Sequence, residues 1–372
     1  MRPHRRHAPG PSRRGVRQGG LRLPGHPRGG VWRGPRSRKG RLTVRSVRSL
    51  ALNNTPVLLL VVVFLVFSVA DARFFDVHTL TNVARSAAYI GILAVGMTLV
   101  LMTAGIDLSV GSMMYLVAVV VGQVANSYAL PVFLVPVLAM AVGLTFGALN
   151  GFAISVLRVV PFIVTLAMLT AYRGLGLELS ESREVNYPDV IGQLGAQPIL
   201  GVPLPVWVFV VVVVLAHVLV TRTPFGRQLL ATGEDRRAAE RAGIPVRRIL
   251  FTVYVVAGAL AGLAAFVAMT QLRTAAPGFG TADEFDAIAA AVLGGTSLFG
   301  GRGSVFPGTV VGVLLIQLIQ TGLQFMQVDL YITPMVQAAI ILLAVFVDSA
   351  RTGRLERLGR RHITSSRMET AA

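Results

Sequence analysis

A long polar stretch, residues 221–248, lies between two strongly apolar runs and limits how this chain can fold. The flanking runs, residues 204–220 and 249–269, are each long enough to cross a bilayer as a helix. The polar stretch is therefore expected to be a loop between two membrane spans. It holds seven arginines against three acids, which predicts a cytoplasmic location by the positive-inside rule.

The same loop carries signals for a short helix of its own, over Gly233–Ala242. Thr232 followed three residues later by Asp235 predicts a capping box, Gly243 is typical of the position just past a helix end, and Pro245 would stop the helix. A helix tethered at the membrane surface by two spans is a platform for a cytoplasmic partner. The alternative interpretation is a solvated linker helix.

The composition indicates a polytopic membrane protein. Of the 372 residues 53% are hydrophobic and 14% charged, and the mean hydropathy of +0.67 exceeds what a soluble domain can bury. The apolar runs predict an all-α membrane protein with about ten transmembrane helices and both termini cytoplasmic. An eighth span beginning at Asp286 and a tenth over residues 332–347 are among them. Glycines beside Ser, Thr and Asp predict broken or re-entrant segments at residues 105–111 and 294–303.

Composition also divides the chain into three parts. Residues 1–48 hold fourteen arginines and Lys39 without any acid, which predicts a disordered basic arm. Residues 49–349 are the predicted transmembrane domain, and residues 350–372 a basic cytoplasmic tail. The arm has the charge to bind anionic lipid or nucleic acid. We favour a non-functional extension, with membrane lipid and not nucleic acid as the partner of the chain.

Several kinds of chemistry lack the residues that they need. The chain has no cysteine, no pair of histidines at metal-ligand spacing and no G-x-S-x-G motif, so no catalytic, metal or cofactor site is expected, and the protein is not predicted to be an enzyme. Lys39 is the only lysine and Gly40 follows it, so a Walker A loop is excluded. Transport driven by ATP would require a partner subunit to hydrolyse it.

Polar residues at membrane depth are costly there and are candidates for a translocation path. Asp107 admits two interpretations: a proton or cation site, or a cap that accepts the backbone N–H groups of Ser109 and Val110. We favour the cap. Uncharged polar groups such as Asn150 and Tyr172 could bind a hydroxylated solute or a neighbouring helix. The candidates for path residues are Thr98, Asp107, Ser109, Thr165, Arg173, Asp286 and Thr296.

Four stretches resemble the permeases of ribose/xylose-type ABC sugar importers, within the branched-chain amino acid/sugar permease superfamily. The likeness extends over residues 82–349 and follows the same order along the chain. The stretches are GILAVGMTLVLMTAGIDLSVGS (91–112), PFIVTLAMLTAYRGL (161–175), TPFGRQLLATGEDRRAAERAGI (223–244) and DAIAAAVLGGTSLFGGRGSVFPGT (286–309).

The resemblance implies a permease in the bacterial plasma membrane, paired with itself or with a homologous permease. It would translocate a sugar, such as a pentose, delivered by an extracytoplasmic binding protein and driven by cytoplasmic ATPase subunits. Alternatives are a permease for branched-chain amino acids or nucleosides, and a proton-coupled secondary transporter. The implied ATPase-coupling loop contains Gly226, Arg227, Gly233, Glu234, Ala238, Ala239 and Gly243.

Overall fold

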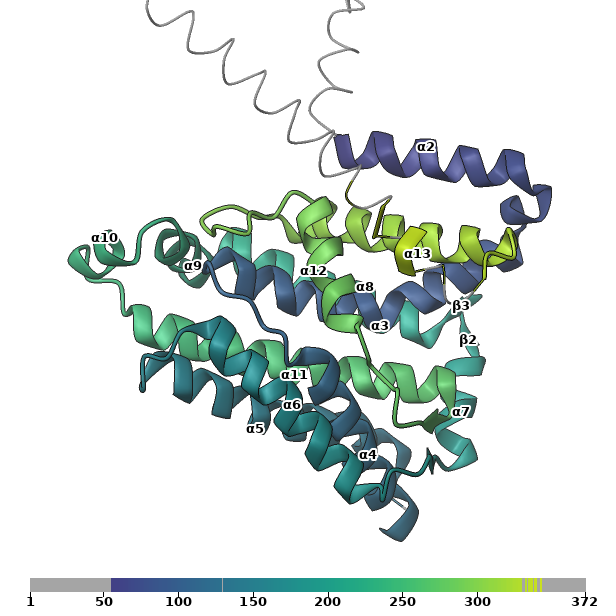
Figure 1. Ribbon diagram of the computed structural model, residues 1–372, viewed down its shortest axis with the longest axis horizontal. Coiled ribbons are helices and arrows are strands. Elements are labelled where there is room, and N and C mark those ends of the chain that lie inside the picture. Colours follow the sequence, from purple (N-terminus) through teal and green to yellow (C-terminus); the bar gives the residue numbers. More distant parts are fainter. Residues whose placement is uncertain are drawn as a thin grey trace, which may run out of the picture. The chain divides into compact units, whose positions relative to one another are not determined.

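The computed structural model describes residues 55–128 and 130–329, and with them 332, 334–336, 338–339 and 342. This part of the chain is almost entirely helical (Figure 1). The predicted arm 1–48, the tail 350–372 and most of the predicted tenth span lie outside the described residues.

Seven helices in the described part of the chain are long and apolar enough to cross a bilayer. The predicted all-α membrane fold is confirmed at this level, whereas the number ten and the cytoplasmic location of both termini stay predictions. The seven are α3 (Val77–Met102), α4 (Val110–Tyr128), α5 (Val135–Ser155) after the short η2 (Val132–Leu134), α6 (Pro161–Leu179), α8 (Leu204–Arg222), α11 (Val246–Leu272) and α13 (Val310–Phe325) after η3 (Val305–Thr309).

Two of the predicted spans are shorter than a full crossing. Helix α2 (Thr55–Ala70) is apolar but has 16 residues, and it leads through η1 (Ala72–Phe75) into α3. The predicted eighth span is wrong, because α12 (Asp283–Leu293) has only 11 residues. At 1.5 Å per residue it rises roughly 16 Å, about half of the hydrocarbon core. It ends at a glycine pair whose second member, Gly295, has φ +89°.

Both predicted glycine-rich breaks interrupt regular helix. Residues 103–109 separate α3 from α4, and residues 294–304 separate α12 from η3. In Figure 1 the first of these connections runs from the α9 end of α3 back among the helices before α4 begins. Re-entry of either segment into the bilayer stays a prediction.

Two connections, residues 180–203 between α6 and α8 and residues 273–282 between α11 and α12, pair with each other. Strand β1 (Val185–Asn186) pairs antiparallel with β4 (Thr274–Ala275), and the Tyr187 N–H donates to the Arg273 carbonyl at 3.1 Å. The helix α7 (Asp189–Ala196) packs against α11, and a small hairpin, β2 (Pro198–Ile199) with β3 (Val202–Pro203), leads into α8.

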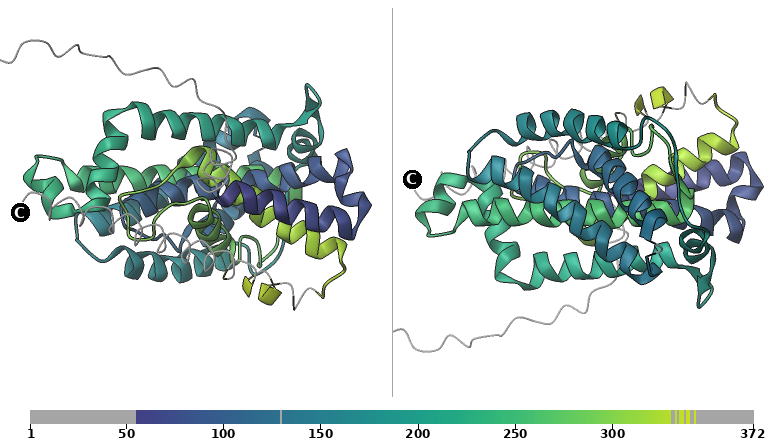
Figure 2. Two further views of the ribbon diagram at one scale, coloured as in Figure 1. Left: turned by 90° about the horizontal axis from the view of Figure 1, so that it is seen from above. Right: turned by 90° about the horizontal axis from the view of Figure 1, so that it is seen from below.

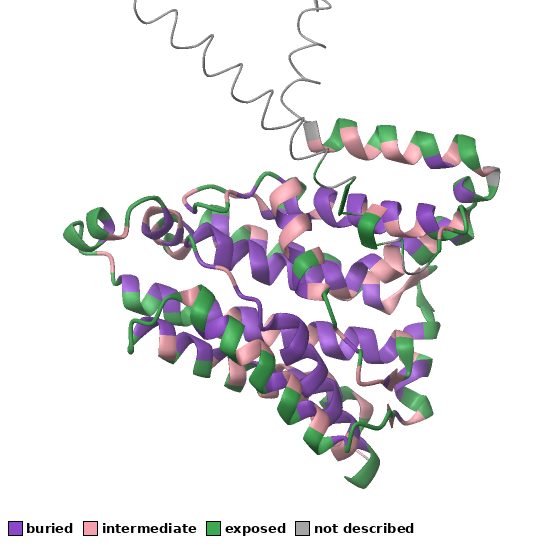
Figure 3. Ribbon diagram, viewed as in Figure 1, coloured by how far each residue is buried: buried purple, intermediate pink, exposed green. Residues whose placement is uncertain are grey.

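The core is built around α3, α4 and α11, whose residues are mostly buried (Figure 3). Figure 2 shows α8 on one side of α3 and α11, and α5 on the other. Glycines let α5 and α11 approach closely: a Cβ added to Gly258 would lie only 2.6 Å from the Gly147 Cα. We call this contact of Gly143 and Gly147 with Gly258 and Gly262 the α5–α11 seam; small residues at helical spacing let the two spans pack closely there.

Candidate coupling surface and transmembrane polar network

The polar stretch forms two short helices, α9 (Pro224–Glu234) and α10 (Arg236–Arg241), at one end of the described chain (Figure 1, left). Asp235 separates them and caps α10, its Oδ1 accepting the backbone N–H groups of Arg237 at 2.8 Å and Ala238 at 3.0 Å. These bonds, first that from Ala238, lower the pKa of Asp235 below its ordinary value, because they stabilise the carboxylate.

The predicted capping box is therefore wrong, and so is the single helix Gly233–Ala242. Thr232 lies inside α9, where its hydroxyl donates to the Gln228 carbonyl at 2.8 Å and cannot cap α10. The role predicted for Gly243 is confirmed: it follows the end of α10 with φ +79°.

The end of α9 meets two other segments through backbone contacts. A Cβ on Gly233 would lie 2.6 Å from the Gly301 nitrogen and closer still to the Met102 carbonyl, which accepts the Gly301 N–H at 3.1 Å. The Arg236 guanidinium donates to the Thr103 carbonyl at 3.3 Å. We call this contact of α9, the end of α3 and the turn at Gly300–Gly301 the α9 junction. The turn at Gly300–Gly301, within the predicted break at residues 294–303, thus lies against the predicted coupling loop.

The seven coupling residues predicted from the sequence fall into two groups. Gly226, Gly233 and Ala239 are buried within this chain, and Arg227, Glu234, Ala238 and Gly243 are exposed. Ala239, at 4% exposure, packs against Val246 and Leu250 of α11. The prediction that both alanines face a partner is wrong for Ala239. Consecutive helix residues point in directions about 100° apart, so Ala238 faces outward while its neighbour faces the chain.

A buried hydrogen-bond network surrounds the break between α3 and α4. The Asp107 Oδ1 accepts the backbone N–H of Ser109 at 2.9 Å and its hydroxyl at 2.6 Å, which confirms a cap at Asp107. Val110, the other predicted donor, supplies neither bond. Asn150 on α5 donates to the Ser109 hydroxyl at 2.8 Å and accepts from the Tyr172 hydroxyl of α6 at 2.9 Å. The network therefore ties the break to two spans.

Thr165 joins the same break from α6, its hydroxyl donating to the Ile106 carbonyl at 3.1 Å. The structure thus brings together three of the path candidates, Asp107, Ser109 and Thr165, and all three are fully buried in the single chain. Beside this break, the Asp107 Oδ2 and the Tyr254 hydroxyl are buried and have no hydrogen-bond partner among the described residues.

The other path candidates have different partners. Thr98 is buried and its hydroxyl lies 2.7 Å from that of Thr309, which links α3 to η3. Thr296 is buried, with no partner for its hydroxyl in the described part of the chain. Asp286 on α12 accepts from the Gln320 side chain of α13 at 2.8 Å.

Arg173 is partly exposed and holds the segment that precedes α12. Its guanidinium donates to the carbonyls of Pro277 at 3.2 Å and Phe279 at 2.7 Å, and lies 4.8 Å from the Tyr115 ring centroid. Arg173 and Asp286 are the two path candidates with part of the side chain accessible.

Sequence reasoning missed Thr309, Tyr254 and Glu284 as members of these clusters. Thr309 and Tyr254 are polar residues in apolar runs, so a search for polar side chains at membrane depth could have found them. Glu284 is 6% exposed, and its carboxylate packs directly on Gly111. No local signal distinguishes it from its acidic neighbours.

Long apolar helices, buried polar groups bonded between spans and a tethered pair of surface helices define a multi-pass membrane protein of the permease kind. Residues 79–345 match the family described as "Branched-chain amino acid transport system / permease component". The chain belongs to this family, and it is accordingly a transport component and not an enzyme. No solved structure matches the chain.

Several named relatives align with this chain over most of their own length. It is 37% identical to the ribose import permease protein RbsC of Escherichia coli (strain K12) over 297 residues, 78% of this chain and 92% of that protein. It is 36% identical to RbsC of Bacillus subtilis (strain 168) over 307 residues, 80% and 92% of the two chains. The fructose import permease protein FrcC of Rhizobium meliloti is 32% identical over 303 residues, 79% and 84%.

Proposed function

We propose that the chain is the membrane-spanning permease subunit of an ABC importer and that it translocates a monosaccharide such as a pentose. The observation that carries this proposal is the similarity to ribose and fructose import permeases over about four fifths of the chain. The family description names branched-chain amino acid transport, which is the alternative solute class. The similarity to named sugar permeases favours a sugar over an amino acid as the solute.

Cytoplasmic ATPase subunits are the proposed partners of the α9–α10 surface. The chain lacks a lysine that could serve a Walker A loop, since its only lysine is Lys39. The exposed residues of α9 and α10 combine a small side chain, Ala238, with charges on either side, Arg237 and Glu240. A small residue inside a charged rim suits close docking into a groove.

The α9 junction supports a route from this surface into the membrane. Gly233 touches the backbones of both Met102 and Gly301, and no flexible side chain lies between them. A displacement of α9 must therefore displace the end of α3 and the glycine turn, because close-packed backbones cannot absorb it. We infer that ATP-driven motion reaches the spans here.

An extracytoplasmic binding protein is the proposed partner of the opposite end. There β1 and β4 join two connections, and an open polar hollow of about 490 Å³ is lined by residues such as Gln123, Glu181 and Arg183. Pairing of two permease subunits, identical or homologous, completes the proposed importer. Arg173 and Asp286 remain the proposed path residues, because the other candidates are buried within one chain.

The experiment that tests the function is uptake of radiolabelled ribose by proteoliposomes that contain the full chain, with and without a candidate ATPase subunit and a candidate sugar-binding protein. We expect uptake with both partners and ATP, and competition by other pentoses but not by leucine. Uptake of radiolabelled leucine in place of ribose would assign the amino-acid class. Uptake by the chain alone under a proton gradient would overturn the ABC mechanism.

A further inference from the structure

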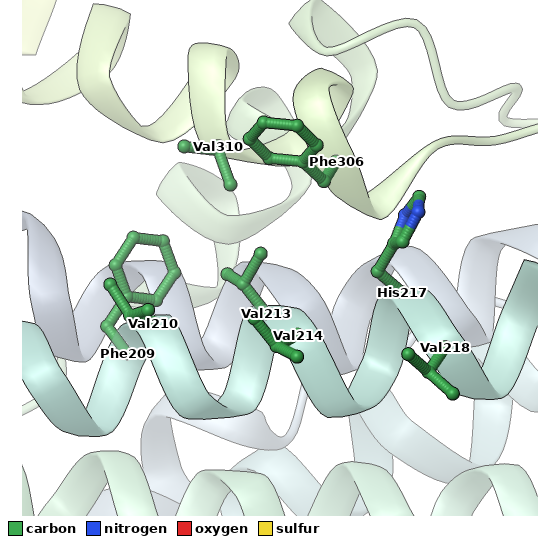
Figure 4. A pocket seen from close by; sticks show the side chains of 8 residues that line it. All are labelled: Phe209, Val210, Val213, Val214, His217, Val218, Phe306 and Val310. Carbon is green, nitrogen blue, oxygen red and sulfur yellow. The ribbon is translucent and has the colours of Figure 1, made fainter.

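An apolar groove of about 280 Å³ lies between α8 and the start of the last described span, formed by η3 and the first residue of α13 (Figure 4). Two rows of side chains on α8 line it, and each row repeats every four residues, as expected for one helix face. Phe306 and Val310 line the other side. The α8 rows are Phe209, Val213 and His217, and Val210, Val214 and Val218.

His217 is the polar residue of this groove and lies toward the α9 end of α8. Its side chain points to the opposite segment, where the ring meets Phe306 edge to face at a centroid distance of 6.1 Å (Figure 4). No hydrogen bond of the ring joins it to another described residue. One end of the groove is therefore purely apolar, and the other offers a ring nitrogen.

Two arginines follow or precede the residues of the histidine end closely along the chain, although neither lines the groove itself. Arg222 continues the row Val210–Val214–Val218 by one more step of four residues and is the last residue of α8. Arg302 precedes Phe306 by four residues on the other side of the groove. Both are exposed, and neither forms an ion pair with a residue of the described chain. His217 precedes Arg222 by about 7.5 Å along the axis of α8, at 1.5 Å per residue.

We propose that this groove, the α8 groove, binds an anionic phospholipid of the leaflet on the α9–α10 side. One acyl chain lies along the valine and phenylalanine rows, His217 contacts the ester region, and Arg222 and Arg302 bind the phosphate. Arginine at a helix end lies at the level of the headgroups, and basic pockets between transmembrane helices recognise anionic lipid. The groove thus matches the chemistry of such a lipid from one end to the other.

A second copy of the chain fits the groove less well. In a symmetric pair of permeases both copies contribute the same patch, at the same membrane depth. Each copy would bring Arg222 and Arg302 to that contact, and four positive charges there oppose pairing. A lipid phosphate removes this repulsion, and so the charge pattern selects the lipid.

The test uses the purified, delipidated full chain, titrated with phosphatidylglycerol or phosphatidylcholine of the same acyl chains and followed by native mass spectrometry. Val214→Trp fills the groove, and Val211→Trp is the matched control. Both valines are on α8, with exposures of 53% and 54%, but Val211 does not line the groove. A further variant combines Arg222→Gln with Arg302→Gln, and Arg248→Gln is its control on α11.

We expect phosphatidylglycerol to occupy its tightest site about tenfold more weakly in Val214→Trp and in the double glutamine variant, with both controls like wild type. Phosphatidylcholine should bind the wild type weakly. Three results would overturn the proposal: Val214→Trp binding phosphatidylglycerol as wild type does, the two lipids binding equally well, or Val214→Trp abolishing pairing without loss of lipid. Sugar uptake is not measured, so the outcome is independent of the proposed transport function.

Discussion

The α5–α11 seam and the α9 junction are both built on glycine, and they differ in what the glycine is for. At the seam, Gly147 and Gly258 lie in regular helices and bring two long spans into backbone contact. At the junction, Gly300 and Gly301 have φ +84° and +72°, and they meet a helix end from a distant part of the chain. The seam holds two spans at a fixed distance. The junction connects three segments that are far apart in sequence.

This difference separates stability from coupling. A side chain at the seam pushes apart two helices of the core, so its cost falls on folding. A side chain at the junction displaces α9 from α3 and the glycine turn while most of the core keeps its packing. Substitutions at the two places should therefore have different consequences.

The largest effect is expected at the seam. Gly258→Val places a branched side chain where even a Cβ would lie 2.6 Å from the Gly147 Cα, and neither backbone can move aside. We expect a loss of about 3 kcal/mol of stability, at the upper end for overpacking. Thermal unfolding in detergent measures it. Gly174→Val on α6 is the control, because nothing lies within 4 Å of a Cβ there. Equal melting temperatures for the two variants would show that the backbone contact at the seam does not determine stability.

The next effect separates the two alanines of α10. Ala239→Arg introduces a charge beside Val246 and Leu250, so it should lower the melting temperature, at a cost of about 2 kcal/mol. Ala238→Arg points outward and should leave the melting temperature unchanged while solute-stimulated ATP hydrolysis and uptake fall together. Wild-type uptake in Ala238→Arg, with the ATPase subunit still co-purifying, would mean that α10 is a solvated linker.

The seam was accessible to sequence reasoning, since small residues at helical spacing are a local pattern. So was the cap at Asp107, because Ser109 is two residues away. The break at Asp235 was not: both Thr232 and Asp235 are good caps, and the choice depends on how Gly233 docks against Met102, far away in the sequence. The inward direction of Ala239 likewise depends on the packing of α10 against α11.

The prediction of a full eighth span at α12 was wrong for a different reason. Its apolar run continues through Gly294 and Gly295, so composition alone cannot distinguish a full span from a half-length helix. The helix ends where Gly295 takes φ +89°, beside a close backbone contact: a Cβ on Gly294 would lie 2.5 Å from the Gly308 carbonyl carbon. Glycine pairs of this kind are visible in a sequence, but the segment that each of them meets is not.

A smaller effect distinguishes backbone conformation from contact at the junction. Gly301→Ala and Gly295→Ala both place an L-residue at positive φ, at a cost of about 1–2 kcal/mol. Only Gly301 touches Glu234: a Cβ added to Gly301 would lie 3.1 Å from the Glu234 Cα. Nothing lies within 4 Å of a Cβ added to Gly295. The two variants should melt alike, while ATP-driven uptake falls further in Gly301→Ala. Uptake equally reduced in both would show that the contact with α9 carries no coupling.

The smallest effect is expected at the Asp235 cap, which is fully exposed to solvent. Its pKa is lowered in the folded chain, so the charged cap stabilises α10 above the ordinary aspartate pKa near 3.8, and this stabilisation is lost as the pH falls through the lower folded value. Asp235→Asn keeps a capping side chain without the titration.

Hydrogen exchange of the Ala238 amide measures the opening of α10, and the ratio of the variant rate to the wild-type rate cancels the intrinsic pH dependence of exchange. That ratio should exceed one at neutral pH, because the carboxylate also interacts favourably with the N-terminal end of the helix. It should decrease below about pH 4, and a ratio that stays constant down to pH 2 would contradict the charged cap.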